Sequence, residues 1–243
     1  MSIKLLVGQL INYIIKSAIK LNYKLVPFIP GGRILPLDLK RANITPKIIF
    51  DVGANIGQTS NYFINHFPQS EIYSFEPVAD TYRQLINNSS HSKNISCFNQ
   101  ALGSVTQKST IYVNSSSGSS SINGKFNDQF LHTETIDINT GHNFCTKNNI
   151  EEIDLLKIDT EGFEMEVLKG FEPLLKDHVK MIYAEIGFIP DDIYKTYIND
   201  LLSYTSNYGF IVSGFYEPFR GGFGSLRIGF CNILLINTFL VDK

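Results

Sequence analysis

The stretch KIIFDVGANIGQTS, residues 47–60, constrains the fold of this chain more than any other part of its sequence. It begins with apolar, mostly β-favouring residues, which is typical of a short strand buried on both faces. Gly53 and Gly57 then allow a tight turn, and the polar residues that follow can begin a helix. A buried strand, a glycine turn and a helix form the first unit of a doubly wound α/β sheet, in which ligands bind beyond the carboxyl ends of the strands.

An aspartate distinguishes this turn from one that binds a pyrophosphate. The dinucleotide-binding pattern is G-x-G-x-x-G, and a carboxylate in the turn would repel phosphate. Here the pattern is D-x-G-x-N-x-G, formed by Asp51, Gly53, Asn55 and Gly57. This arrangement favours a ligand with a cationic amino-acid end, which the glycines allow to approach the backbone closely. The alternative is an ordinary strand-to-helix turn.

A second acidic residue follows the next predicted strand. After a predicted helix at residues 60–67, residues 71–75 alternate like a strand and end at Glu76, which is followed by Pro77. The acid at this place in nucleotide-binding sheets accepts hydrogen bonds from ribose hydroxyls, and the proline disfavours helix at Glu76. We therefore predict that Glu76 binds a ribose, against the alternative of a solvated surface glutamate.

Two motifs resemble one enzyme family. FDVGANIGQTS followed by YSFEP is similar to the start of class I S-adenosylmethionine-dependent methyltransferases. DLLKIDTEGFE at residues 154–164, with residues 167–170, resembles the FkbM-type methyltransferases in particular, and the similarity covers roughly residues 48–237. The resemblance implies a Rossmann-like α/β fold, with a doubly wound, seven-stranded, mostly parallel sheet that contains one antiparallel strand. It also implies S-adenosylmethionine as the cofactor.

The resemblance further implies an adenine-binding turn after the third predicted strand, residues 95–98. The matching positions are Asn99, Gln100 and Ala101. Amide groups and a small residue can meet the edge of a purine, so the chemistry is suitable. A purely structural turn is the alternative.

A second group of candidate functional residues lies at the end of a later predicted strand, residues 153–158. That strand ends at Asp159, with Glu161 close behind it, and a strand at residues 180–185 brings Glu185 to the same edge of the sheet. Methyl transfer requires an aligned acceptor, and an alcohol must also lose a proton, which a carboxylate or a histidine can take. We predict Asp159, Glu161 and Glu185 as catalytic residues. His132 and His142 are alternatives.

A magnesium ion between these acids would lower the pKa of the acceptor, and oxygen ligands suit such a cation. In the segment HTETIDI, however, Ile138 occupies a position where the family often has another acid. The sequence therefore does not favour Mg²⁺, and we predict no metal ligand.

The residues after Asp159 are predicted to begin a helix. Thr160 is predicted to cap the next helix, with Glu164 and Glu166 in its first turns, where the helix dipole favours acids. This explains both glutamates structurally. A further helix is predicted at residues 191–204.

Two stretches are predicted to be loops. The serine-rich residues 114–121 have almost nothing to bury, which favours a mobile loop that closes over substrate or an ordinary surface linker. Residues 217–227 separate predicted strands at residues 210–215 and 231–237. Aromatic rings in this stretch can stack on a sugar, and its arginines can bind a phosphate or carboxylate. The alternative is a long hairpin loop without a binding role. The candidates are Tyr216, Phe219, Phe223, Arg220 and Arg227.

The length of 243 residues suits one α/β domain with a small appendage. Residues 1–47 carry eight basic side chains against Asp38 alone, a net charge of +7, so the remainder carries −9 of the total of −2. The total charge gives no indication of nucleic-acid binding. We predict a basic, helical N-terminal extension over residues 1–42 and a methyltransferase domain over residues 43–243.

Residues 3–25 are rich in Leu and Ile, with Lys16, Lys20 and Lys24 along one helical line. The uncharged run is too short to span a bilayer, and no clear cleavage site follows. Three interpretations stay open: a helix packed on the domain, a dimer element, or an amphipathic helix in peripheral contact with the inner face of an anionic membrane. Three widely spaced cysteines match neither a disulfide framework nor a zinc site and favour a cytoplasmic location.

The predicted function is transfer of a methyl group to a sugar hydroxyl of a surface glycan, or of its lipid-linked or nucleotide-linked precursor. The family resemblance implies the reaction and, together with the basic extension and the aromatic loop, points to a sugar hydroxyl. A macrolide-type small molecule or a nitrogen acceptor would use the same framework. Two other classes stay open, a nucleotide-dependent oxidoreductase, against which Asp51 argues, and a non-catalytic glycan-binding protein.

Overall fold

The computed structural model describes residues 34–114, 120–122, 130–220 and 226–241. The chain divides into two units, Met1–Thr45 and Pro46–Lys243. In the first unit, helix α2 (Leu35–Arg41) has a proline at its start and basic residues in its last turn, where the helix dipole favours them. The predicted helix within residues 3–25, and with it the membrane interpretation, lies outside the described residues. None of the helices that the structure describes is long and apolar enough to cross a membrane.

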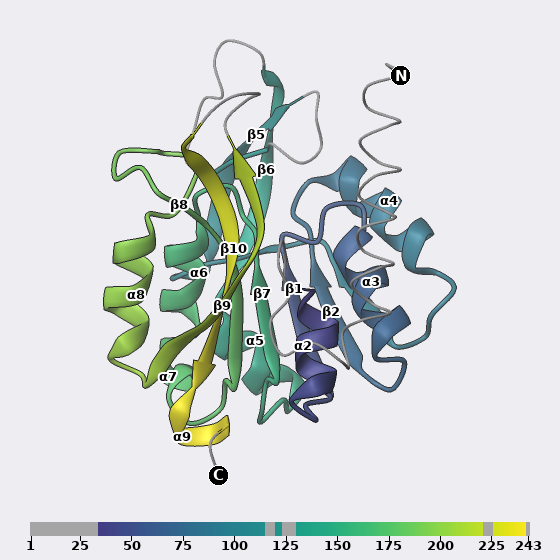
Figure 1. The fold of residues 1–243 in the computed structure, drawn as a ribbon. Helices are drawn as coiled ribbons and strands as arrows, with labels where there is room; N and C mark the ends of the chain where they lie inside the picture. Colours follow the sequence, from purple (N-terminus) through teal and green to yellow (C-terminus); the bar gives the residue numbers. More distant parts are fainter. Residues whose placement is uncertain (1–33, 115–119, 123–129, 221–225, 242–243) are drawn as a thin grey trace, which may run out of the picture. The chain divides into compact units, whose positions relative to one another are not determined.

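The second unit is built on a seven-stranded sheet with the order β3-β2-β1-β7-β8-β10-β9 (Figure 1). All of its described strand pairs are parallel except the two that β10 makes with β8 and β9. The predicted fold, a doubly wound and mostly parallel sheet with one antiparallel strand, is therefore confirmed. The strands are β1 (Ile48–Val52), β2 (Glu71–Phe75), β3 (Ile95–Phe98), β7 (Leu155–Ile158), β8 (Met181–Gly187), β9 (Phe210–Arg220) and β10 (Ile228–Asn237).

Helices cover both faces of this sheet, with α3 and α4 on one side and α5 to α8 on the other (Figure 1). Right-handed crossovers place helices on opposite faces because the sheet grows first from β1 to β3 and then, on the other side of β1, from β7 to β8. The helices are α3 (Gln58–His66), α4 (Ala79–Ser89), α5 (Gly141–Asn148), α6 (Glu164–Gly170), α7 (Glu172–Leu175), α8 (Ile198–Ser206) and the C-terminal α9 (Thr238–Val241).

An aromatic core packs against the central strands. Phe50 of β1 is fully buried, and its ring makes edge-on contacts with Phe144 of α5 and with Phe171, each at a centroid distance of 5.8 Å. Every residue of β7 and β8 is buried, which explains their nearly continuous apolar sequences. This packing fixes the carboxyl ends of β1, β7 and β8 relative to one another.

A second sheet, separate from the first, has the order β4-β6-β5 and contains β4 (Ala101–Leu102), β5 (Gln107–Asn114) and β6 (Phe130–Asn139). Strand β6 contains the whole segment HTETIDI, and β5 pairs with it in antiparallel register. Ile111, Ile136 and Ile138 form its buried core. Ile138 is thus a packing residue.

Two local predictions were wrong, and a third is described only at its ends. Helix α8 begins at Ile198 instead of residue 191, because the preceding residues run along the end of β8, where the Gly187 N–H donates to the Thr196 carbonyl. Residues 115–119 of the predicted serine-rich loop lie outside the described residues, but Ser121 is buried and pairs with Tyr112 of β5. Strand β9 continues to Arg220, well into the predicted hairpin loop.

Candidate active site

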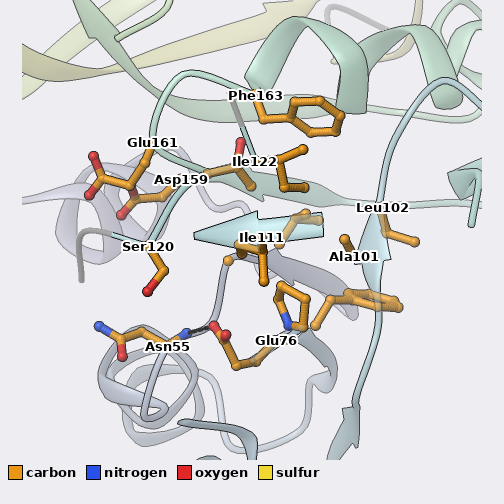
Figure 2. A pocket seen from close by; sticks show the side chains of 15 residues that line it. Asn55, Glu76, Ala101, Leu102, Ile111, Ser120, Ile122, Asp159, Glu161 and Phe163 are labelled. Carbon is orange, nitrogen blue, oxygen red and sulfur yellow. Dashed lines mark hydrogen bonds between the residues drawn. The ribbon is translucent and has the colours of Figure 1, made fainter. Parts of the chain in front are cut away.

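A pocket of about 670 Å³, including its open mouth, lies beyond the carboxyl ends of β1, β2 and β7. Figure 2 shows that its two sides differ: Asn55, Ser120, Asp159 and Glu161 direct polar atoms to one side, whereas apolar side chains form the other. The apolar side comes mainly from the small sheet, with one residue from the segment between β5 and β6 and another from the loop between β7 and α6. Its labelled members are Ala101, Leu102, Ile111, Ile122 and Phe163.

The glycine turn after β1 forms the floor of the pocket. Gly53 has a φ of 75°, and a Cβ atom there would lie 1.9 Å from the carbonyl oxygen of Asp159, so only glycine fits. Asn55 also has a positive φ, of 49°. Gly57, with a φ of 92°, is the residue before α3, where a Cβ would press on Leu85. The structure thus brings Gly53 and Asn55 to the pocket, whereas Gly57 packs against α4.

Glu76 lies at the end of β2 with only 7% of its surface exposed. One carboxylate oxygen accepts a hydrogen bond from the Asn55 N–H at 3.1 Å, and the other accepts one from the Val78 N–H at 2.9 Å. Burial raises the pKa of Glu76 to about 7, although these two N–H donors act to lower it. The carboxyl group is therefore rigidly held beside the glycine turn.

The adenine-side residues are only partly brought to the pocket. Ala101, in β4, lines it. The exposed Asn99 instead donates to the carbonyl oxygens of Glu76 and Pro77, at 3.0 and 2.9 Å, and so holds the loop that carries Glu76. Gln100 is half-buried and does not line the pocket.

Asp51 does not reach the pocket. It is fully buried in β1, opposite Lys157 of β7. The Lys157 ammonium lies 2.8 Å from one Asp51 oxygen, and the hydroxyl of Ser60 donates to the other at 2.6 Å. Lys157 also donates to the Gly53 carbonyl at 2.9 Å. Asp51 and Lys157 together therefore support the glycine turn from inside the protein.

The acidic edge predicted at the ends of β7 and β8 is assembled. Asp159, Glu161 and Glu185 each offer a carboxylate oxygen within 4.8 Å of the others. Asp159 and Glu161 line the pocket, whereas Glu185 lies behind them and is 8% exposed. Lys195 pairs with both glutamates, at 2.7 Å from Glu161 and in direct contact with Glu185.

Burial and the neighbouring carboxylate of Asp159 raise the pKa of Glu185 to about 7. Burial also raises the pKa of Glu161, and Lys195 opposes the shift in both glutamates. Since Lys195 lies between Glu161 and Glu185, its ammonium supplies the positive charge that a metal ion would otherwise bring there. The sequence-based preference for a site without Mg²⁺ stays a prediction, because Asp159, Glu161 and Glu185 are close enough together to bind a metal ion.

The loop that carries Glu161 is built differently from the predicted helix start. Helix α6 begins at Glu164, and Thr160 does not cap it. Instead the buried Glu164 carboxylate accepts hydrogen bonds from the N–H groups of Thr160 and Gly162. Glu161 has a φ of 52°, a region that few non-glycine residues occupy, and its carbonyl accepts a hydrogen bond from Ser121. The surrounding contacts thus hold Glu161 in a strained backbone conformation.

The proposed alternatives to these acids lie elsewhere. His132 of β6 pairs with Glu134 at 2.9 Å, and His142 is exposed at the start of α5. Neither lines the pocket. Tyr216 was wrongly predicted to face a sugar, because it is buried against Tyr183. Phe223 lies outside the described residues.

Comparison with known proteins identifies the family. The sequence model described as "Methyltransferase FkbM domain" matches residues 51–212. The chain belongs to the FkbM methyltransferase family. A curated relative, the hexuronic acid methyltransferase AglP of Haloferax volcanii, is 29% identical over 157 residues, which are 61% of this chain and 60% of the relative. The match thus spans less than two thirds of that relative.

Two solved structures have similar folds. The fibrillarin pre-rRNA processing protein of Methanococcus jannaschii is 15% identical, with a TM-score of 0.48 over 85% of this chain and 70% of its own. TrmK of M. capricolum, in complex with S-adenosyl-homocysteine, is 10% identical, with a TM-score of 0.47 over 82% of this chain and 67% of its own.

The chain therefore carries an S-adenosylmethionine-dependent methyltransferase domain, and this finding replaces the oxidoreductase alternative. The pocket fits this cofactor. The apolar side suits an adenine ring, and Glu76 offers a fixed carboxylate for ribose hydroxyls. The side-chain oxygen of Asn55 is buried without a hydrogen-bond partner among the described residues, so an acceptor remains for a ligand donor.

Sequence reasoning missed three residues that organise the site: Lys157, Lys195 and Glu164. A signal existed for Lys157, because a lone charge inside the apolar run LLKI requires a buried partner. Glu164 was explained by the helix dipole, and only its burial revealed the loop contacts. Lys195 gave no signal, since residues 191–204 were predicted to form a helix.

We expect the affinity for S-adenosylhomocysteine to decrease as the pH is lowered through about 7, because a protonated Glu76 can no longer accept both ribose hydrogen bonds. Between about pH 8 and pH 6, calorimetry should show a decrease approaching tenfold. Asp51 and Lys157 also act on Glu76, but with opposite signs.

Glu185 also has a raised pKa, and it serves as the control. The pH dependence should vanish in Glu76→Gln and persist in Glu185→Gln. A dependence that survives in Glu76→Gln would assign it to another group.

Proposed function

We propose that this methyltransferase acts on a sugar hydroxyl of a glycan or of its lipid-linked or nucleotide-linked precursor. The observation that carries this proposal is the Glu161 carboxylate, which lines the pocket and is held there by Lys195. A relative named as a hexuronic acid methyltransferase supports a sugar as the class of acceptor.

Glu161 is the proposed base. When bound, S-adenosylmethionine supplies a methyl group on a positively charged sulfur. As the acceptor hydroxyl becomes methylated, its proton would pass to the Glu161 carboxylate. Glu185 does not line the pocket, so its role is to position Lys195 and, through Lys195, Glu161.

An aromatic surface continues from this base towards solvent. The Lys195 ammonium lies 4.9 Å from the centroid of the Phe230 ring, and Phe219 stacks on Phe230 at 4.7 Å. Phe219 is 51% exposed, so its ring offers an apolar surface to the C–H face of a sugar. Phe219 therefore lies on a chain of contacts that ends at the proposed base.

The charges at the acidic edge favour a hydroxyl over a carboxylate as the acceptor atom. Asp159, Glu161 and Glu185 bring three carboxylates to this edge, and Lys195 pairs with two of them. A sugar carboxylate placed among them would be repelled, whereas a neutral hydroxyl donates its proton to an oxygen. We therefore expect an ether product and not an ester.

Mass spectrometry of glycans from cells with and without the gene tests this function. The expected result is a methyl group that is lost with the gene, belongs to a sugar residue and resists mild alkali. An alkali-labile methyl ester would identify a carboxylate acceptor. Unchanged glycans, with loss of methylation on a small molecule or a nitrogen, would refute a sugar hydroxyl acceptor.

Phe219→Ala should raise the KM for the sugar acceptor about three- to tenfold, the scale of one lost aromatic contact, and leave the affinity for S-adenosylhomocysteine unchanged. Ile211→Ala is the matched control, because Ile211 lies on the same strand and is also 51% exposed. Steady-state kinetics with the acceptor and calorimetry with the cofactor product separate the two effects. An unchanged KM would remove Phe219 from the acceptor site.

A further inference from the structure

The sequence assigns the cationic amino-acid end of the ligand to Asp51, but the structure leaves that carboxylate no room for a ligand. Asp51 is fully buried, and both of its oxygens are engaged, one by Lys157 and the other by Ser60. Its negative charge is therefore balanced within the protein. Another group must meet the ammonium of S-adenosylmethionine.

Asp159 is placed to do so. It follows β7, which is adjacent to β1, and its N–H donates to the Val52 carbonyl at 3.0 Å. Its own carbonyl lies against Gly53, at the position where a Cβ would come within 1.9 Å. Asp159 is thus anchored directly beside the glycine turn, the part of the pocket where the sequence pattern places the amino-acid end.

The carboxylate of Asp159 is also the one that is not closely paired. Its side chain is 39% exposed, and Lys157 lies 3.8 Å away while making much closer contacts with Asp51 and the Gly53 carbonyl. Glu161 and Glu185, by contrast, share Lys195. One carboxylate that faces the pocket is therefore left with a weakly balanced charge.

The charges around the pocket agree with a cationic ligand. Four carboxylates, on Asp51, Asp159, Glu161 and Glu185, face two ammonium groups in this cluster, a surplus of negative charge. S-adenosylmethionine brings an ammonium and a sulfonium against one carboxylate. The buried, unpartnered side-chain oxygen of Asn55, which also lines the pocket, is a second acceptor for an N–H donor.

We propose that Asp159, and not Asp51, receives the ammonium group of the cofactor, which leaves Glu161 as the carboxylate for the acceptor. Asp159 is then a cofactor-binding residue. This inference concerns the cofactor alone and holds whatever the acceptor is, so failure of the proposed sugar acceptor would not affect it.

Calorimetry with two ligands tests the proposal. S-adenosylhomocysteine carries the amino-acid end, whereas 5′-methylthioadenosine lacks it. In Asp159→Asn, affinity for S-adenosylhomocysteine should fall about 10- to 100-fold, the range for a lost charged hydrogen bond, and affinity for 5′-methylthioadenosine should stay within about twofold. Asp159→Ser should behave in the same way, which guards against an effect particular to one replacement.

Asp137→Asn is the matched control, because Asp137 is exposed on β6, pairs with Lys108 at the surface and does not line the pocket. It should bind both ligands like the wild type. Two results would overturn the proposal: unchanged affinity for S-adenosylhomocysteine in both Asp159 variants, or an equal loss for both ligands. The second result would mean that Asp159 shapes the pocket without meeting the ammonium.

Discussion

Glu161→Gln should reduce turnover by about 10²- to 10⁴-fold, the usual contribution of a general base, and leave the affinity for S-adenosylhomocysteine within about twofold. The amide keeps the size of the side chain and its hydrogen bond to Lys195, but it cannot take the proton of the acceptor. Single-turnover kinetics with the true acceptor, together with calorimetry, would measure both quantities. Turnover and affinity must be measured separately because a purely structural role of Glu161 would alter cofactor binding as well.

Glu151→Gln is the matched control for this variant, because Glu151 is exposed and does not line the pocket. It should retain full activity. Full activity in Glu161→Gln would instead show that another group removes the proton.

The pH profile gives a further readout of the same site. Lys195 lowers the pKa of both glutamates, so Lys195→Met should raise those pKa values and move the rise in activity to higher pH. In the wild type, activity should rise as the pH increases through about 7, because Glu185 becomes ionised there and can hold Lys195.

Lys157→Met should lower the free energy of unfolding by about 3–5 kcal/mol, the cost of leaving one partner of a buried ion pair unpaired. Lys157 is 4% exposed, and its loss would leave Asp51 buried beside Ser60 alone. It would also release the Gly53 carbonyl, so affinity for S-adenosylhomocysteine should fall together with stability. Chemical denaturation and calorimetry measure the two effects.

Two comparisons decide whether the buried charge is the cause. Lys108→Met removes an exposed lysine that pairs with Asp137, and it should cost less than about 1 kcal/mol. Adding Asp51→Asn to Lys157→Met should recover part of the lost stability, because the unpaired charge is then absent. If the double variant is no more stable than the single one, the loss arises from packing.

The sequence by itself determined the framework of this protein. The apolar run of β1, the glycines behind it and the acid after β2 are local patterns, and local backbone preferences were enough to predict a doubly wound sheet with a ligand pocket at its carboxyl edge. The convergence of Asp159, Glu161 and Glu185 was also predictable, since parallel strands bring their carboxyl ends to one edge.

The partners of the charged groups were decided only by the tertiary structure. Lys157 and Gly53 are 104 residues apart, and their contact depends on the register of β7 against β1. Lys195 reaches Glu161 and Glu185 because residues 191–197 run along the end of β8 and do not form the predicted helix. A sequence shows which residues carry charge, but the free energy of a buried charge depends on its neighbours in space, and these separated the supporting Asp51 from the pocket-facing Asp159 and Glu161.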